Sequence, residues 1–312
     1  MKTQPLLATT IIVLGMLGTG CGGGEPPEAG DDRLKIVATT TIVGDLVRAI
    51  GGDDVQVDVL MGPGIDPHLY KASAGDVRAM SSADAIIYNG LFLEGKLSEV
   101  LEELGERGVT TVAVAECVDP AKLVAHADYD GLADPHVWFD VSLWTEAAEC
   151  LGTALAELDP ARAGGFEERA RTYREELAVL DEWVRSTVAE LPADRRILVT
   201  AHDAFSYFAK AYDFEVRGLL GVSTASEAGT ADVQALAEFI VERRVPAVFV
   251  ESSVSPRFVE ALQEAVAARG FEVVIGGTLY SDSLGDPSSE AATYLGTVRS
   301  IVQTIVGALT AE

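Results

Sequence analysis

The chain has 312 residues, of which 48% are hydrophobic and 23% charged, so it can bury a substantial core, and its length predicts about two domains. Its 23 Lys and Arg stand against 49 Asp and Glu, which gives a formal net charge of −26 with only four His and three Cys. This charge excludes nucleic acid as a partner and adhesion to an anionic membrane through charge, because both need clustered Lys and Arg. The remaining partners are cations, small molecules or a protein.

Residues 1–20 have the pattern of an export signal. Lys2 precedes a largely apolar run from Leu6 to Leu17, which is shorter than the roughly 20 residues that span a bilayer but fits a signal-peptide core. Small residues then precede Cys21, which begins a Gly-, Pro- and Glu-rich tether over 21–33. This arrangement resembles a bacterial lipoprotein processing site, although Gly18 stands where such sites usually have Leu. We therefore predict lipidation of Cys21; the alternative is ordinary cleavage with Cys21 lost or free.

Short β-branched runs alternate with helical segments from residue 34 onward. The first set of runs covers 34–38, 55–60, 85–88 and 110–114, with helical segments such as 42–50 and 91–104 between them. The second set covers 197–200, 247–250 and 271–275, with helices at about 230–243, 257–269 and 290–309. This alternation predicts an α/β fold in which each of two lobes, 34–163 and 193–312, has a mostly parallel sheet with flanking helices.

A long helix is predicted between the two sets. Residues 166–191 are rich in Glu, Arg, Ala and Leu and contain no Pro or Gly, and such a helix would be roughly 39 Å long. Its apolar residues recur at steps of three or four and form one stripe: Tyr173, Leu177, Leu180, Val184, Val188 and Leu191. We expect a linker helix over 164–192 that packs along both lobes as a spine and limits hinge motion.

One phrase occurs twice: Asp66-Pro67-His68 and Asp134-Pro135-His136 are each followed by an aliphatic and an aromatic residue. Pro restricts the backbone around it, so each imidazole is presented from a stiff corner and loses little conformational freedom on binding. The Asp can accept a hydrogen bond that orients the ring, as is common beside metal-bound His. Metal ligation by His68 and His136 is the favoured interpretation; the alternative is turn chemistry by Asp-Pro with an incidental His.

The remaining histidines differ in context. His202 directly follows a predicted strand, and ligands collect at the carboxyl ends of strands in α/β folds, so it is a third candidate ligand unless it serves as a helix cap. His126 lies in an acidic loop and is expected to be a solvated residue. Cys117 and Cys150 are 33 residues apart; we favour two buried free thiols over a disulfide. No Cys-x-x-Cys spacing exists, which excludes a cysteine-rich zinc site.

Five segments together resemble the zinc/manganese solute-binding proteins of bacterial ABC importers (cluster A-I, periplasmic solute-binding protein family 9, TroA-like). They are Gly-Ile-Asp-Pro-His at 64–68, Asp-Pro-His-Val-Trp at 134–138, Thr-Ala-His-Asp-Ala-Phe-Ser-Tyr-Phe at 200–208, Gly-Val-Ser-Thr-Ala-Ser-Glu-Ala at 221–228 and Ser-Asp-Ser-Leu-Gly-Asp at 281–286. The resemblance implies two α/β lobes joined by one long helix, with His68, His136, His202 and Asp282 as metal ligands in the cleft.

The resemblance leaves the metal open between Zn²⁺ and Mn²⁺. Manganese-directed relatives often have Glu at the third ligand position, where this chain has His202. Zinc-directed relatives often carry a His-rich loop before the second ligand, whereas the 123–133 loop is short and has only His126. Three imidazoles and a carboxylate suit both ions. Because a ligating His must be neutral, the ordinary His pKa predicts loss of metal as pH falls through about 6.

The resemblance further implies a receptor, not an enzyme, that is exported and anchored to the cell membrane by lipid, facing out of the cytoplasm. Its expected partners are a divalent metal ion, a cognate permease and the ATPase that drives it, and we expect a monomer. Two alternatives remain: a periplasmic zinc-dependent hydrolase and a binder of an iron chelate. Four protein ligands close a zinc site, whereas catalytic zinc usually keeps one position open. No His-Glu-x-x-His or Gly-x-Ser-x-Gly motif is present either.

Overall fold

A four-stranded parallel sheet organises the first lobe in the computed structural model, which describes Met1 and residues 32–126, 130–226 and 228–310. The strands β1 (Leu34–Ala38), β2 (Val55–Val59), β3 (Ala85–Tyr88) and β4 (Thr110–Ala113) lie in the order β2-β1-β3-β4. The helices α1 (Thr41–Gly51), α2 (Ala74–Ser81) and α3 (Ser98–Glu106) connect them, as parallel strands require. Neighbouring residues of one strand face opposite sides: Ile36 joins the main core and Val37 a smaller core under α3.

The helix predicted over 91–104 begins only at Ser98. Leu91 and Phe92 have φ values of +52° and +67°, which no helix accommodates. The cause is the buried Glu94 carboxylate, which accepts hydrogen bonds from the backbone N–H groups of Asn89 and Gly90 and thereby folds the segment into turns. Hydrophobic periodicity alone does not reveal a buried acid that binds the backbone beside it.

The second lobe is built from two pairs of parallel strands. The strands β5 (Ile197–His202) and β6 (Glu215–Leu220) form one pair, β7 (Ala247–Glu251) and β8 (Val274–Leu279) form the other, and β5 lies against β7. The helices α6 (Ser206–Tyr212), α7 (Thr230–Arg243), α8 (Arg257–Ala267) and α9 (Tyr294–Thr310) flank them. The α/β fold class and the parallel pairing are therefore as predicted for both lobes.

Two strands of this lobe differ from the sequence prediction. β6 was missed, because only its last two residues are buried and its pattern carries little signal. β8 begins at Val274 and extends past Gly276, whereas the prediction placed a strand at 271–275. A side chain at Gly276 would collide with Ala308 of α9 and Phe249 of β7, so the glycine permits close packing inside a strand instead of ending it.

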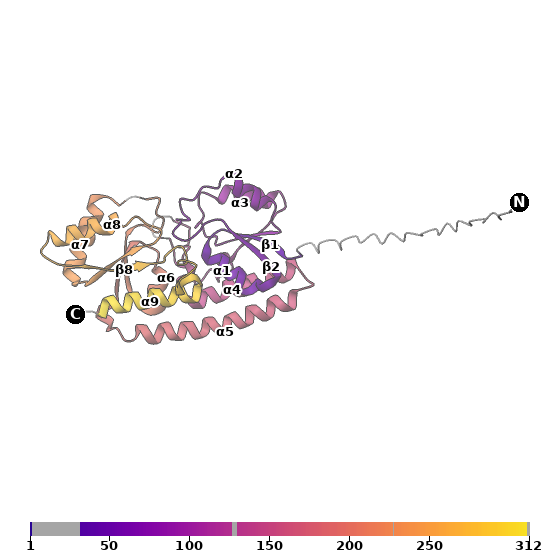
Figure 1. Ribbon diagram of the computed structural model, residues 1–312. Helices are drawn as coiled ribbons and strands as arrows, with labels where there is room; N and C mark the ends of the chain where they lie inside the picture. The colour runs from indigo at the N-terminus through magenta and orange to yellow at the C-terminus, as the bar shows by residue number, and fades with distance from the viewer. Residues whose placement is uncertain (2–31, 127–129, 227, 311–312) are drawn as a thin grey trace. The chain divides into compact units, whose positions relative to one another are not determined.

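The long helix α5 (Ala163–Val188) runs beneath both lobes in Figure 1. It contacts α1 and α4 (Val141–Leu158) of the first lobe and α6 and α9 of the second. Its buried face contains the predicted stripe from Tyr173 to Val188 and begins earlier, at Phe166. The helix starts at Ala163, one residue before the predicted linker helix over 164–192, and ends at Val188, ahead of Leu191. One hydrophobic core extends from the first sheet across α5 to α9, so the spine is shared by both lobes.

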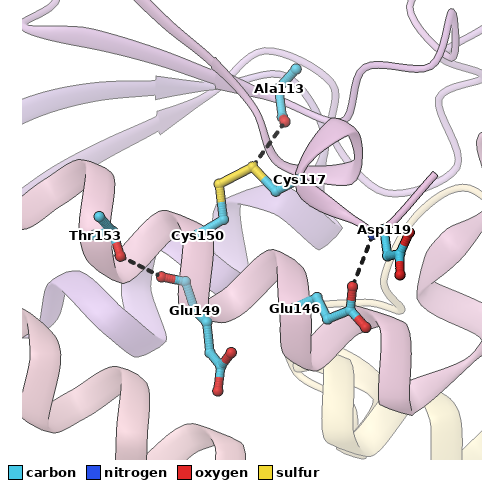
Figure 2. Close-up of a disulfide and its surroundings, with 7 residues drawn as sticks. All are labelled: Ala113, Cys117, Asp119, Glu146, Glu149, Cys150 and Thr153. Carbon is cyan, nitrogen blue, oxygen red and sulfur yellow. Dashed lines mark hydrogen bonds between the residues drawn. A yellow bond between two sulfur atoms is a disulfide. The ribbon is translucent and has the colours of Figure 1, made fainter. Parts of the chain in front are cut away.

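Cys117 and Cys150 form a disulfide, which corrects the preference for two free thiols (Figure 2). Cys117 ends the short 3-10 helix η2 (Val114–Cys117) and Cys150 lies on α4, with their Cα atoms 6.2 Å apart. Cys117 is exposed, so the sulfur pair lies near the surface. Sequence spacing gives no information on this geometry, because the approach of η2 to α4 depends on the tertiary fold.

Residues 33–312 form one compact unit that contains both lobes. The predicted signal peptide after Met1, Cys21 and the predicted tether up to residue 31 lie outside the described residues. Within the described parts of the chain, no helix is both long enough and apolar enough to cross a membrane.

Candidate metal centre

The four candidate ligands predicted from the sequence come together at one point. His68 lies in the loop after β2, His136 directly precedes the 3-10 helix η3 (Val137–Phe139), His202 ends β5 and Asp282 lies in the loop after β8. One ligand atom of each side chain lies within 4.8 Å of the other three. All four are buried, and His68, at 5% exposure, is the most accessible.

The first Asp-Pro-His phrase is tied to both lobes. Asp66 Oδ1 accepts a hydrogen bond from the backbone N–H of His68 at 2.9 Å, which fixes the corner that presents the ring. Asp66 Oδ2 accepts a hydrogen bond from the Thr224 hydroxyl of the second lobe at 2.6 Å. The predicted orienting role of this Asp therefore applies to the backbone of His68, and its second oxygen joins the lobes.

The second phrase repeats the corner and adds a contact to the ring. Asp134 Oδ1 accepts a hydrogen bond from the backbone N–H of His136 at 2.9 Å and lies 2.8 Å from its Nδ1 atom. The Tyr207 hydroxyl donates to the Asp134 carbonyl at 2.8 Å, and the Asn89 amide donates to the Pro135 carbonyl at 3.0 Å. With Nδ1 occupied, the Nε2 atom of His136 is the one that faces the other ligands, 3.4 Å from Asp282 Oδ1.

The two candidate ligands of the second lobe are both supported from the end of β7 and the residues that follow it. Glu251 Oε1 accepts a hydrogen bond from the backbone N–H of His202 at 2.8 Å, and Oε2 lies 2.5 Å from the ring Nδ1 atom. Ser253, two residues further on, donates to Asp282 Oδ2 at 2.6 Å. Asp282 Oδ1 is thereby left toward the histidines, 3.5 Å from Nε2 of His202.

The loops that carry the candidate ligands are hydrogen-bonded across the lobes. The Gly64 N–H donates to the Ser283 hydroxyl at 2.9 Å, and the Trp138 indole N–H donates to the Ser281 carbonyl at 3.1 Å. Each bond joins a residue within four positions of a candidate histidine to a neighbour of Asp282. The geometry of the cluster is consequently coupled to the arrangement of the two lobes.

Several buried polar atoms meet at this point without a hydrogen-bond partner: Nε2 of His68, His136 and His202, and Oδ1 of Asp282. Buried polar atoms of folded proteins are almost always paired, so four unpaired atoms that converge from four separate segments of the chain indicate a ligand for them. Three imidazole nitrogens and one carboxylate oxygen are a donor set suited to zinc and to manganese.

Burial and the neighbouring charges shift the pKa values of the candidate ligands in different directions. Burial lowers the pKa of His68 to about 3, although Asp282 opposes this shift. For His136, burial also lowers the pKa, but the Asp134 and Asp282 carboxylates outweigh it and raise the pKa to about 9. The pKa of His202 is raised well above its ordinary value despite burial, through Glu251 and Asp282. Burial acts to raise the pKa of Asp282, but the histidines hold it well below its usual range.

A small cavity of about 130 Å³ adjoins the cluster on the side of His68. Its lining includes His68, Pro135, Ser223 and His126. The sequence placed His126 in solvent, but it is half-buried, and its backbone N–H donates to the Leu132 carbonyl at 2.9 Å. His126 is therefore beside the four-residue cluster without being part of it.

Sequence reasoning missed Thr224, Glu251 and Ser253, which support the candidate ligands. The only signal was position: the phrase Glu251-Ser252-Ser253 follows a predicted strand of the second lobe, where ligand-binding residues collect. Nothing in the sequence pairs Glu251 with His202, because their contact depends on β5 and β7 lying side by side.

Two α/β lobes on a shared long helix, with a buried cluster of three His and one Asp between them, define a two-lobed solute-binding protein with a candidate metal centre. Residues 36–308 match the family model described as zinc-uptake complex component A, periplasmic (ZnuA), and the chain belongs to this family.

Individual relatives extend the match over nearly the whole chain. The zinc-binding protein TroA of Treponema pallidum (strain Nichols) is 46% identical over 305 residues, which cover 97% of this chain and 98% of TroA. The manganese-binding lipoprotein MntA of Bacillus subtilis (strain 168) is 43% identical over 306 residues, which cover 98% of this chain and 99% of MntA. A solved structure of the periplasmic zinc-binding protein TroA from Treponema pallidum has a TM-score of 0.85 at 47% identity and covers 89% of this chain and 99% of that one. The predicted TroA-like fold is thus confirmed.

Proposed function

We propose that this protein is an extracytoplasmic receptor of an ABC transporter that captures Zn²⁺ or Mn²⁺ between its lobes and delivers the ion to a permease driven by an ATPase. The observation that carries the proposal is the convergence of unpaired donor atoms from His68, His136, His202 and Asp282, which we assign as the ligands. Two donors come from each lobe, so the captured ion would bridge the lobes.

The choice of cargo is supported by chemistry and by relatives. The donor set suits both ions, although raw affinity for such a site favours zinc over manganese. The relatives of 46% and 43% identity are named as a zinc-binding and a manganese-binding protein, respectively. We therefore retain both ions as cargo and propose that metal supply decides which one is carried.

We further propose that the protein holds its metal without catalysing a reaction. Four protein ligands from rigid supports leave little room for the open coordination position that a catalytic zinc uses to activate water. The relatives are named for metal binding, and several are named as lipoproteins or as components of ABC transporters. This argues against the hydrolase alternative. An iron-chelate binder would not need the convergent imidazoles.

The N-terminal sequence and the names of relatives such as the manganese-binding lipoprotein MntA support export and anchoring. We propose cleavage before a lipidated Cys21 and a monomeric receptor tethered to the membrane, facing out of the cytoplasm. The proposed segments are a signal peptide over 1–20, a tether over 21–33, lobes over 34–163 and 193–312, and the linker helix over 164–192.

Metal analysis of protein purified without a His tag tests the assignment. We expect about one zinc or manganese ion per chain and no bound organic molecule. Replacing His68 and His202 together with Ala should abolish binding, because one donor is removed from each lobe. The matched control is His126→Ala, which removes the one histidine outside the cluster and should leave metal content unchanged. Full metal content in the double variant would reject the ligand assignment.

A further inference from the structure

Glu251 is a buried carboxylate with no role in the ligand set proposed above. It ends β7, is 3% exposed and faces His202 at the end of the neighbouring β5. Its Oε1 atom accepts the backbone N–H of His202 at 2.8 Å, and its Oε2 atom lies 2.5 Å from the ring Nδ1 atom. Both oxygens are therefore directed at the same residue.

This contact determines which ring nitrogen can bind a cation. A neutral imidazole carries one N–H, and the other nitrogen has the lone pair. A carboxylate is only an acceptor, so an oxygen beside Nδ1 favours the tautomer with the proton on Nδ1. The lone pair is then on Nε2, the atom that lies 3.5 Å from Asp282 Oδ1 and faces the other candidate ligands.

We propose that Glu251 is the positioning residue for His202: it holds the Nδ1 proton and the ring orientation, and so keeps the Nε2 lone pair directed at the captured ion. The inference rests on the proposed function, because it concerns one ligand of the same site. Asp134 makes the corresponding contact to the His136 ring from the adjacent phrase, whereas the Asp66 carboxylate binds the backbone of His68 and Thr224. Glu251 differs from both because it reaches its histidine from another strand.

Glu251→Gln separates this role from a merely structural one. The amide has one acceptor and one donor end. If its oxygen accepts the His202 backbone N–H, its NH₂ faces Nδ1, which must then carry the lone pair and leave the proton on Nε2. If the amide is reversed, two donors meet at the buried backbone N–H. The first arrangement opposes ligation through Nε2, whereas the second keeps the Nδ1 proton but leaves a buried donor unpaired; the side chain keeps its size in both.

The experiment measures zinc affinity of the metal-free wild-type chain, Glu251→Gln and a matched control, Asp45→Asn, by competition with a chelator. Asp45 is a half-buried carboxylate that also accepts a backbone N–H, from Tyr294 at 2.8 Å, but it lies on α1 and is absent from the cluster. We expect Glu251→Gln to weaken zinc binding by about 10–100-fold, the usual effect of losing a partner of a metal-bound His. Asp45→Asn should stay within about threefold of wild type.

A second measurement uses the wild-type protein alone and does not depend on the variant folding. NMR of the zinc-loaded, ¹⁵N-histidine-labelled chain is tractable because the sequence has four His. His202 should show a zinc-bound Nε2 and a hydrogen-bonded Nδ1 proton, and that proton signal should change in Glu251→Gln. Zinc bound through Nδ1 of His202, wild-type affinity in Glu251→Gln, or equal losses in both variants would overturn the inference. Absence of metal binding by the wild type would instead reject the proposed function.

Discussion

The disulfide between Cys117 and Cys150 should contribute strongly to stability and little to metal affinity. It closes a segment with a sequence separation of 33 residues and attaches η2, after the edge strand β4, to the middle of α4. Around it, Glu146 on α4 accepts the backbone N–H of Asp119 at 3.0 Å (Figure 2). The perturbation is the double variant Cys117→Ser/Cys150→Ser, which removes the covalent link and keeps the side chains small and polar.

The expected loss can be calculated from the length of the closed segment. In the chain-entropy model, a closed loop of this length lowers the entropy of the unfolded chain by about 12 cal/mol/K, or about 4 kcal/mol at 25 °C. Unfolding of residues 33–312 has an entropy of about 0.6 kcal/mol/K at its midpoint. The double variant should therefore unfold about 6 °C below the wild type.

Metal affinity should be nearly unchanged, although His136 lies inside the closed segment. The backbone of this histidine is held by Asp134, and the preceding carbonyls are held by Asn89 and Tyr207. None of these bonds involves the disulfide. Each of these hydrogen bonds contributes about 1 kcal/mol and forms whether or not the disulfide is present. We therefore expect zinc affinity to stay within about threefold of wild type.

Calorimetric melting of metal-free wild type, reduced wild type and the double variant checks the stability effect, and zinc titration checks the affinity. The proteins must be metal-free during melting, because a bound ion raises the midpoint by mass action. Equal midpoints for all three would refute the stability reasoning. A tenfold or larger loss of zinc affinity at an unchanged fold would show that the disulfide itself positions the His136 segment.

Three further predictions concern the spine, the protons and the lobes. Leu177→Ala on the fully buried face of α5 should cost about 2–5 kcal/mol of unfolding free energy, whereas Val179→Ala, 66% exposed, should cost less than about 0.5, as measured by denaturant titration. Because the pKa values of His136 and His202 are raised in the metal-free site, to about 9 for His136, zinc binding at pH 7.5 should release about two protons and tighten as pH rises toward 9. Calorimetry in buffers of different ionisation enthalpy measures this release, and its absence would contradict the raised values. X-ray scattering should show a radius of gyration that changes by less than about 1 Å on metal binding, because one core spans both lobes; a larger change would reject the rigid spine.

Two of the candidate ligands, His68 and His136, could be predicted from local signals. Each Asp-Pro-His phrase builds its own corner, in which the Asp carboxylate accepts a hydrogen bond from the backbone two residues later. The stripe on α5 is also local, since helical periodicity places its residues on one face. Assigning Asp282 to the same cluster required the family resemblance, because no local pattern distinguishes it from the many other acids of the chain.

The supports of the ligands could not be predicted, because they depend on contacts between distant segments. Glu251 reaches His202 across neighbouring strands, and Thr224 reaches Asp66 across the lobes. The disulfide likewise depends on where η2 meets α4. From the sequence, the ordinary His pKa predicted that metal is lost near pH 6. The carboxylates beside His136 and His202 raise the pKa values of these rings, so protons compete with the metal at higher pH than predicted.

The acidity of the chain matters for metal capture mainly where it is buried. Exposed charges are screened over about 10 Å in salt, so the net charge of −26 has little effect on a buried ion. Asp134, Glu251 and Asp282, by contrast, place three carboxylates around the imidazoles with almost no exposure to solvent. Without a cation, protons on His136 and His202 offset this negative charge, which is the physical reason for their raised pKa values. A divalent ion can replace those two protons without changing the net charge of the site. We therefore expect capture to release protons from these two histidines, and the carboxylates that face them to influence the pH at which the ion binds.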